Sequence, residues 1–267
     1  MKIWIDMKNS HEPLFFKSIM SEFPQVDFNI TSRDYGELNK LLDKYNIDYN
    51  SFGGHAGKSI IGKIISRGIV RNLQLIRNLD NFDFALSHMS LESIIIGKLK
   101  DKKTIAFTDN ELPQLYTSIP SPFIDFLIAP NCIGDDKLIN LGVRKNNIIK
   151  FKGYKEDIYI ADYKPDLNFF DNFPFRDFVT IRPEAYKAAY LNKKIISLVP
   201  LLAEKLIANG INILYLPRYD EDYNFDFLSS DRVYIPEKPL NGLDVCFYSS
   251  VVLTGSGTLS REAACMG

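Results

Sequence analysis

A glycine- and hydroxyl-rich segment near the end of the chain has the composition of a phosphate-binding loop. An apolar run over residues 251–254 leads into the sequence GSGT, and a helical pattern follows. Glycine lets the backbone turn tightly, and the first amides of a helix point outward with the positive end of the helix dipole. The segment departs from a dinucleotide fingerprint because Ser260 stands where the third glycine belongs. The alternative is a plain strand–helix turn with Thr258 as N-cap.

Charged residues near this segment, and after earlier strands, extend the phosphate-binding pattern. Arg261 could contact a second phosphate oxygen, and Glu262 could accept hydrogen bonds from two ribose hydroxyls. Arg182 and Arg218 follow predicted strands, and a guanidinium group binds phosphate in a bidentate manner. The alternative for both arginines is an ion pair between domains. The candidate residues for binding a nucleotide phosphate or ribose are Arg182, Glu184, Arg218, Gly255, Ser256, Gly257, Thr258, Arg261 and Glu262.

Candidate acid–base residues follow predicted strands in the first half of the chain. His11 lies at a strand–helix junction, and imidazole titrates near neutral pH, which suits general acid or base work. Asp109 and Glu111 follow another predicted strand, where paired carboxylates could bind a sugar, hold a metal or act as a base. The competing interpretations are a helix-start histidine and turn chemistry before a proline. His55 and Ser90 also follow predicted strands and are further candidates for the ligand site.

The segment FGGHAGKS at 52–59 resembles a Walker A loop without matching it. A Walker A loop needs four residues between its glycines, and this segment has three, so a ligand-contacting loop bearing His55 is favoured. The basic residues on the helix predicted to follow are Lys58, Lys63, Arg67, Arg71 and Arg77. We expect these side chains to form a solvated face. Contact with an acidic acceptor or with an anionic membrane surface is the minority alternative.

Composition excludes several classes of protein. The chain has 267 residues, 32 basic and 33 acidic, and a net charge of −1, so nucleic acid is not an expected partner. Its three cysteines are far apart and form no CxxC pair, which argues against a disulfide scaffold or a cysteine zinc site. No apolar run reaches the roughly 18 residues that a transmembrane helix needs. We therefore expect a reducing, cytoplasmic setting.

Short apolar runs alternate with longer helical patterns along the chain. This alternation predicts βαβ units and mostly parallel sheets, so the fold class is α/β. Residues 154–177 lack a clean period and are rich in Asn, Asp and Pro. We therefore predict a first Rossmann-like domain over 1–153, a linker over 154–177 and a second, nucleotide-binding domain over 178–267. Ligands of such open sheets bind beyond the carboxyl ends of the strands.

Eight segments, in order along essentially the whole chain, resemble the archaeal and bacterial DUF354 family. They are KIWIDMKNSHEPLFFK, TSRDYGE, GGHAGKS, FTDNE, FKGYKEDIYI, the IRPE segment up to Tyr190, LPRYDE and GSGTLSREAACMG. The family is similar to the GT-B glycosyltransferases and to UDP-N-acetylglucosamine 2-epimerases. Those proteins have two Rossmann-like domains with parallel sheets that face each other across a cleft. The resemblance therefore implies a GT-B-like fold.

The resemblance also implies roles for particular residues. In that superfamily the second domain holds the nucleoside diphosphate, which would place the phosphates at 255–258, the ribose at Glu262 and the pyrophosphate at Arg182. The first domain holds the acceptor, and its first loop would offer His11. The family usually has a Gly-Gly-Thr loop where this chain has Gly-Ser-Gly-Thr. The family also continues with a further strand and helices, so we expect a truncated chain with an incomplete second domain.

These patterns support one leading hypothesis and two alternatives. The leading hypothesis is glycosyl transfer from a nucleotide-diphosphate sugar to an unknown acceptor, with Arg182 and the 255–258 amides stabilising the leaving group. His11 or Asp109 would then take the acceptor's proton. A UDP-sugar 2-epimerase, using Asp109 or Glu111 at a sugar carbon, is the alternative enzyme. A non-catalytic nucleotide- or sugar-binding protein is the alternative of another class. No cofactor or metal ion is expected, because arginine and the helix dipole would neutralise the diphosphate.

Overall fold

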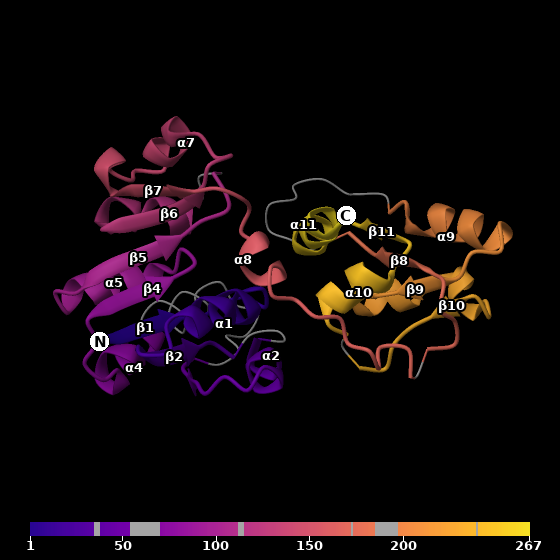
Figure 1. Ribbon diagram of the computed structural model, residues 1–267, viewed down its shortest axis with the longest axis horizontal. Helices are drawn as coiled ribbons and strands as arrows, with labels where there is room; N and C mark the ends of the chain where they lie inside the picture. The colour runs from indigo at the N-terminus through magenta and orange to yellow at the C-terminus, as the bar shows by residue number, and fades with distance from the viewer. Residues whose placement is uncertain (35–37, 54–69, 112–114, 172, 185–196, 239) are drawn as a thin grey trace. The chain divides into compact units, whose positions relative to one another are not determined.

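The computed structural model divides the chain into two compact units (Figure 1). Unit 1 covers Met1–Tyr159 and unit 2 covers Ile160–Gly267. The residues that the structure describes are 1–34, 38–53, 70–111, 115–171, 173–184, 197–238 and 240–267. The predicted ligand-site residue His55 and the basic residues from Lys58 to Arg67 lie outside this described part.

Unit 1 is built on a seven-stranded sheet in which every neighbouring pair is parallel. Its strands are β1 (Lys2–Asp6), β2 (Asp27–Ser32), β3 (Asn50–Ser51), β4 (Phe84–Ser87), β5 (Lys103–Phe107), β6 (Phe126–Pro130) and β7 (Ile148–Phe151). They lie in the order β3-β2-β1-β4-β5-β6-β7. The chain thus runs outward from β1 to β3 and then returns to the other side of β1. The topological switch point, where open α/β sheets bind ligands, lies at the carboxyl ends of β1 and β4.

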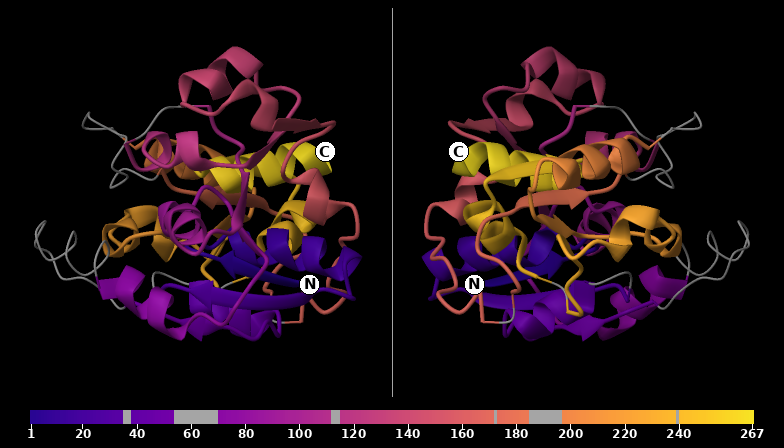
Figure 2. Two further views of the ribbon diagram at one scale, coloured as in Figure 1. Left: turned by 90° about the vertical axis from the view of Figure 1, so that its left-hand side faces the viewer. Right: turned by 90° about the vertical axis from the view of Figure 1, so that its right-hand side faces the viewer.

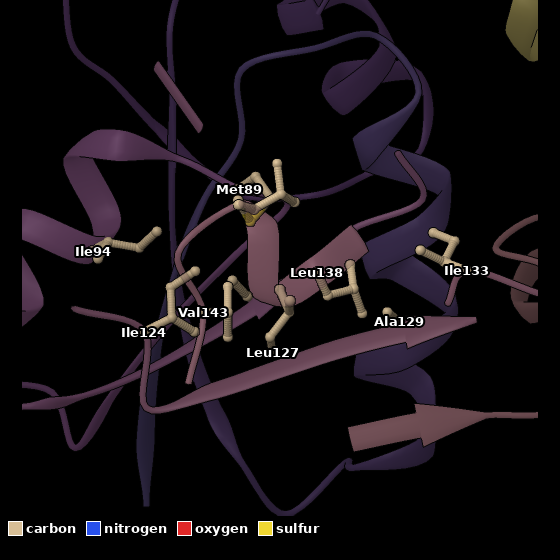
Figure 3. Close-up of a cluster of buried hydrophobic side chains, with 10 residues drawn as sticks. Met89, Ile94, Ile124, Leu127, Ala129, Ile133, Leu138 and Val143 are labelled. Carbon is tan, nitrogen blue, oxygen red and sulfur yellow. The ribbon is translucent and has the colours of Figure 1, made fainter. Parts of the chain in front are cut away.

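Helices flank this sheet and supply its apolar core (Figure 2). They are α1 (Glu12–Glu22), α2 (Leu38–Lys44), α4 (Arg71–Asn78), α5 (Leu91–Leu99), α6 (Leu115–Ser118), α7 (Asp135–Asn140) and, at the boundary with unit 2, α8 (Asp157–Ile160). One cluster joins Trp4 of β1 to Leu75 of α4 and to Phe82. A second cluster joins Leu127 of β6 to Leu138 of α7 and is drawn in Figure 3. Burial of these apolar side chains is the main force that holds the helices on the sheet.

Unit 2 repeats the same plan with four parallel strands. They are β8 (Val179–Arg182), β9 (Ile213–Tyr215), β10 (Val233–Tyr234) and β11 (Val251–Thr254), in the order β10-β9-β8-β11. The described helices are α9 (Val199–Ala208), α10 (Gly242–Tyr248) and α11 (Gly257–Met266). The switch point of this sheet lies at the carboxyl ends of β8 and β11. An α/β chain with parallel sheets was predicted, and both sheets confirm it.

An aromatic cluster packs the segment before β8 into unit 2. Phe169 and Phe173, from the stretch predicted to be a linker, pack around Phe178. Tyr248 of α10 stacks on Phe169, with ring centroids 4.8 Å apart. Aromatic contacts of this kind contribute about 0.5–1.5 kcal/mol beyond the area that they bury. In the described part of the chain, no helix has both the length and the apolar character to cross a membrane.

Candidate functional site

A buried ion pair ties the carboxyl end of β1 to the start of α4. Asp6 is the last residue of β1, Arg71 is the first of α4, and both are fully buried. Arg71 Nη2 donates to Asp6 Oδ1 at 2.6 Å, and Nη1 donates to Oδ2 at 3.3 Å. Burial alone would lower the pKa of Arg71, but the Asp6 carboxylate outweighs it and raises that pKa. The prediction that Arg71 belongs to a solvated basic face is therefore wrong.

Glu92 and Lys8 extend this pair into a network. Lys8 Nζ lies 3.0 Å from Glu92 Oε2, and Arg71 Nη1 lies 3.7 Å from Glu92 Oε1. Glu92 is nearly buried, which alone would raise its pKa. The positive charges of Lys8 and Arg71 outweigh this effect and lower the pKa of Glu92 to about 2. The carboxylate of Glu92 is therefore ionised in the folded protein.

Ser90, a predicted ligand-site residue, is buried at the start of α5. Its hydroxyl donates to Asp6 Oδ2 at 2.6 Å and accepts from the Ser93 amide at 3.3 Å. Met89, the residue before it, has a φ of +53°, which turns the chain sharply at the end of β4. The Met89 side chain is held in the apolar cluster of Figure 3. The turn thus fixes Ser90 on one side and His88 on the other.

His11, Glu12 and His88 gather at the same switch point. His11 is the N-cap of α1, Glu12 is its first residue, and His88 directly follows β4. The two imidazole rings are nearly perpendicular, at 82°, with centroids 5.1 Å apart. The Glu12 carboxylate accepts from the Lys8 amide and from Asn9 Nδ2, both at 2.6 Å. Burial raises the pKa of Glu12, although His88 and these hydrogen bonds oppose the rise.

Asp109 follows β5 and joins His88 to a buried lysine. Its Oδ1 lies 3.4 Å from His88 Nε2, and its Oδ2 lies 2.9 Å from Lys155 Nζ. The Lys155 side chain is only 3% exposed and also lies 3.5 Å from Glu156. This row of imidazole, carboxylate and ammonium can hold or pass a proton. The sequence did not single out Lys155. The usable signal was its place, next to Glu156 and shortly after the end of β7.

Glu111, paired with Asp109 in the sequence, has a different environment. Its carboxylate forms an ion pair with Lys137 of α7 at 2.7 Å, and both side chains are partly exposed. The hydrogen bond from Lys137 is the main reason that the pKa of Glu111 is lowered. A carboxylate with a lowered pKa is a weak base. Of the two predicted carboxylates, Asp109 is the one that contacts His88 at the switch point, and this geometry makes it the better placed for acid–base chemistry.

In unit 2, the predicted phosphate loop lies at the switch point between β8 and β11. The Gly255 amide donates to the carbonyl of Arg182 at 3.1 Å. A Cβ on Gly255 would lie 2.6 Å from the Cα of Glu184, so only glycine fits here. A Cβ on Gly257 would meet no described atom within 4 Å, so the chain beside Gly257 is open to a ligand as far as the described residues show.

Helix α11 begins directly after this turn. Its N-cap is Ser256, not Thr258, and the Ser256 side chain makes no capping hydrogen bond. The first amides of a helix have no partner within the helix, so they remain donors that an anion can satisfy. Leu259 anchors the helix in the core, whereas Gly257 and Arg261 are exposed. The turn therefore has the local geometry of an anion site.

Arg218 follows β9 in a turn that a buried carboxylate fixes. Asp222 Oδ2 accepts from the amides of Arg218 and Tyr219, at 2.8 and 2.9 Å. The Nε and Nη2 atoms of Arg218 are buried and have no hydrogen-bond partner among the described residues. The carboxylate of Glu184, another predicted ligand-binding residue, does not satisfy these atoms and accepts a hydrogen bond from the Ser197 hydroxyl at 2.9 Å, just before α9. Arg218 is therefore the predicted arginine with donor atoms available for a ligand.

Glu262 lies on the side of α11 that faces α10. A Cβ on Gly242, the first residue of α10, would lie 3.1 Å from Glu262 Oε2. Cys246, one turn further along α10, is buried. Burial, and secondarily the charge of Glu262, raises the pKa of the Cys246 thiol to about 12. Glu262 is half-buried, and its negative charge acts on α10 in this structure.

The network around Glu92 makes the free energy of unfolding depend on pH in the acid range. Because the folded pKa of about 2 lies below the ordinary 4.5, the stabilisation is complete above pH 4.5 and is lost as pH falls toward 2. We expect E92Q to remove this contribution, which is on the order of 3 kcal/mol at neutral pH. Urea unfolding of both proteins across this pH range measures it. Parallel stability curves for wild type and E92Q would contradict the network.

The thiols should differ sharply in reactivity. We expect an aromatic disulfide reagent to label exposed Cys132 rapidly and Cys246 more than about tenfold more slowly, because the thiolate is the reactive form. E262Q should speed labelling of Cys246 at alkaline pH, whereas E204Q, at an exposed position of α9, should not. Peptide mapping after timed labelling measures both rates. Equal rates in E262Q and E204Q would place the Glu262 charge away from Cys246.

Two solved structures resemble this fold across nearly the whole chain. The first is the UDP-GlcNAc 2-epimerase of Methanocaldococcus jannaschii in complex with UDP-GlcNAc and UDP, which is 16% identical with a TM-score of 0.74. The match covers 100% of this chain and 82% of the epimerase chain. The second is the UDP-GlcNAc 2-epimerase of Neisseria meningitidis bound to UDP-GlcNAc, which is 12% identical with a TM-score of 0.70. This match covers 100% of this chain and 81% of the epimerase chain. At these identities the likeness concerns the fold, and it confirms the predicted GT-B-like architecture of two parallel α/β sheets.

A sequence relative and a family model complete the comparison. The uncharacterized protein MJ0665 of Methanocaldococcus jannaschii is 24% identical over 283 residues, which cover 100% of this chain and 80% of that protein. The model of the family DUF354, described as a protein of unknown function, matches residues 1–267. The chain therefore belongs to the DUF354 family, as the order of its motifs predicted.

Proposed function

We propose that this protein acts on a nucleoside-diphosphate sugar and that unit 2 binds the diphosphate. The observation that carries the proposal is the turn at 255–258. Gly255 packs against Glu184 so closely that a side chain is excluded, and α11 begins two residues later, at Gly257. Two proteins of the same fold were solved with UDP-GlcNAc bound, which supports this ligand class.

The charges at this end of the sheet suit a diphosphate. The first amides of α11 offer donors and the positive end of the helix dipole. Arg218 adds two buried donor atoms that have no partner among the described residues. Arg182 ends β8, whose backbone bonds directly to the loop. In this proposal the arginines and the helix dipole neutralise the diphosphate, and Glu262 is assigned to the ribose.

For the reaction, we favour inversion of configuration at a sugar carbon next to the anomeric centre. In such an epimerisation, one group removes the proton next to the anomeric carbon as the anomeric bond to the diphosphate breaks. A proton then returns on the opposite face as the diphosphate adds back, so atoms and electrons balance without an oxidant. Asp109, held by His88 and Lys155, and His11 are the acid–base groups of unit 1 that suit this task. Glycosyl transfer remains the second candidate, because the same groups could take a proton from an acceptor hydroxyl.

Nucleotide binding tests the assignment to unit 2. We expect UDP to raise the melting temperature of the protein and to bind measurably by calorimetry. R218A should weaken UDP binding by roughly 10–100-fold, because charge-assisted hydrogen bonds are lost. G257A should weaken it by about tenfold while leaving the fold unchanged, because its added methyl group would meet no described atom within 4 Å but would reach a bound phosphate. GDP, CDP and dTDP in the same assay identify the preferred base.

Two variants control this experiment. R144A removes the same charge from an exposed position of unit 1 and should bind UDP like wild type. G255A should lose stability instead, because its methyl group would collide with the Glu184 backbone. If no nucleoside diphosphate binds, or if R218A and G257A bind as tightly as R144A, the proposed donor site is lost.

Solvent exchange tests the chemistry. With UDP-GlcNAc in deuterium oxide, epimerisation predicts deuterium at sugar carbon 2 and a second stereoisomer, both visible by NMR. D109N should reduce this exchange by more than about 100-fold, whereas E111Q should leave it nearly unchanged, because Glu111 sits in an exposed ion pair. Release of UDP that requires an added acceptor, without exchange at carbon 2, would instead establish transfer. UDP binding with neither reaction would indicate a binding protein.

A further inference from the structure

We propose that His11, Glu12 and His88 form a binding site for one divalent transition-metal ion in unit 1. One possible ligand atom from each of these residues lies within 4.8 Å of those of the other two. The proposal is independent of the nucleotide site, because all three residues belong to unit 1. It makes His11 a metal ligand, which leaves Asp109 as the acid–base group of the proposed reaction. It departs from the expectation that the protein needs no metal.

The backbone brings the three side chains together at the sheet's switch point. His11 and Glu12 open α1 just beyond β1, and His88 follows β4, the strand paired with β1. The perpendicular arrangement of the two imidazoles presents their nitrogens from different directions, as two ligands of one ion require. Two imidazoles and one carboxylate are a donor set that suits zinc and leaves a coordination position for water or substrate.

Neighbouring groups orient two of these ligands, Glu12 and His88, as the outer hydrogen-bond partners of metal ligands do. Glu12 is 1% exposed, and each of its oxygens accepts one hydrogen bond, from Lys8 and from Asn9. A carboxylate oxygen has a second acceptor position, so both can still coordinate. The Asp109 carboxylate contacts His88 Nε2 at 3.4 Å, and a carboxylate behind an imidazole fixes the ring and raises its basicity. Phe15, fully buried, packs edge-on to His88 and forms an apolar wall.

Metal titration of the untagged protein tests the site. All proteins carry C132S, so that the exposed thiol cannot bind metal. After removal of metal with a chelator, we expect one Zn²⁺ per chain by calorimetry and elemental analysis, in the absence of nucleotide. Co²⁺ should give the visible absorption of a site with nitrogen and oxygen ligands. H11A and H88A should each weaken binding by more than about tenfold, and D109N by about 10–100-fold.

A matched pair of acid variants makes the test specific. E12Q removes a proposed ligand, whereas E111Q removes a carboxylate from an exposed ion pair and should bind Zn²⁺ like wild type. Thermal melting of each metal-free variant shows whether it folds. Less than stoichiometric Zn²⁺, or equal affinity in folded H11A and E111Q, would overturn the site. Nucleotide binding by the same variants is measured separately, so a failure here leaves the nucleotide proposal untouched.

Discussion

The buried pair of Asp6 and Arg71 is the interaction on which the first unit depends. A buried carboxylate is strongly unfavourable unless it is paired and fully hydrogen-bonded. Asp6 meets this condition with two bonds from Arg71, one from the Ser90 hydroxyl and one from Thr31 Oγ1 at 2.8 Å. Those partners lie on α4, at the start of α5 and on β2. One side chain thus joins four elements around the switch point.

This polar anchor explains how acid–base groups can sit close to a hydrophobic core. Apolar packing sets the distance between sheet and helix, but it fixes orientation less strictly than directional hydrogen bonds do. Because Ser90 is locked to Asp6, the turn that holds His88 is locked as well. Loss of Arg71 would leave the Asp6 charge buried and unpaired, so the damage would spread to the residues proposed for chemistry. In unit 2, the turn at the switch point is fixed by the close backbone contact between Gly255 and Glu184.

Much of the candidate site could be predicted from the sequence, because the carboxyl ends of parallel strands lie together at one edge of the sheet. His11, Asp109, Arg218 and Gly255 lie just beyond β1, β5, β9 and β11, and Arg182 is the last residue of β8. Helix α10 escaped prediction, since its seven residues are too short and too uniformly apolar to show a helical period. Arg71 was misjudged for a related reason. A basic residue on a helix is usually solvated, and nothing local reveals a carboxylate 65 positions earlier in the chain.

Long-range pairing also explains why two similar residues have different environments. Asp109 and Glu111 are two positions apart in the sequence, yet one contacts buried Lys155 and the other an exposed lysine of α7. Water screens an exposed ion pair more than a buried one, so the contact between Asp109 and Lys155 is the less screened of the two. The sequence could show that two carboxylates follow a strand. Only the packing of β5 beside β6, and the path of the chain beyond β7, decides which of them meets a buried partner.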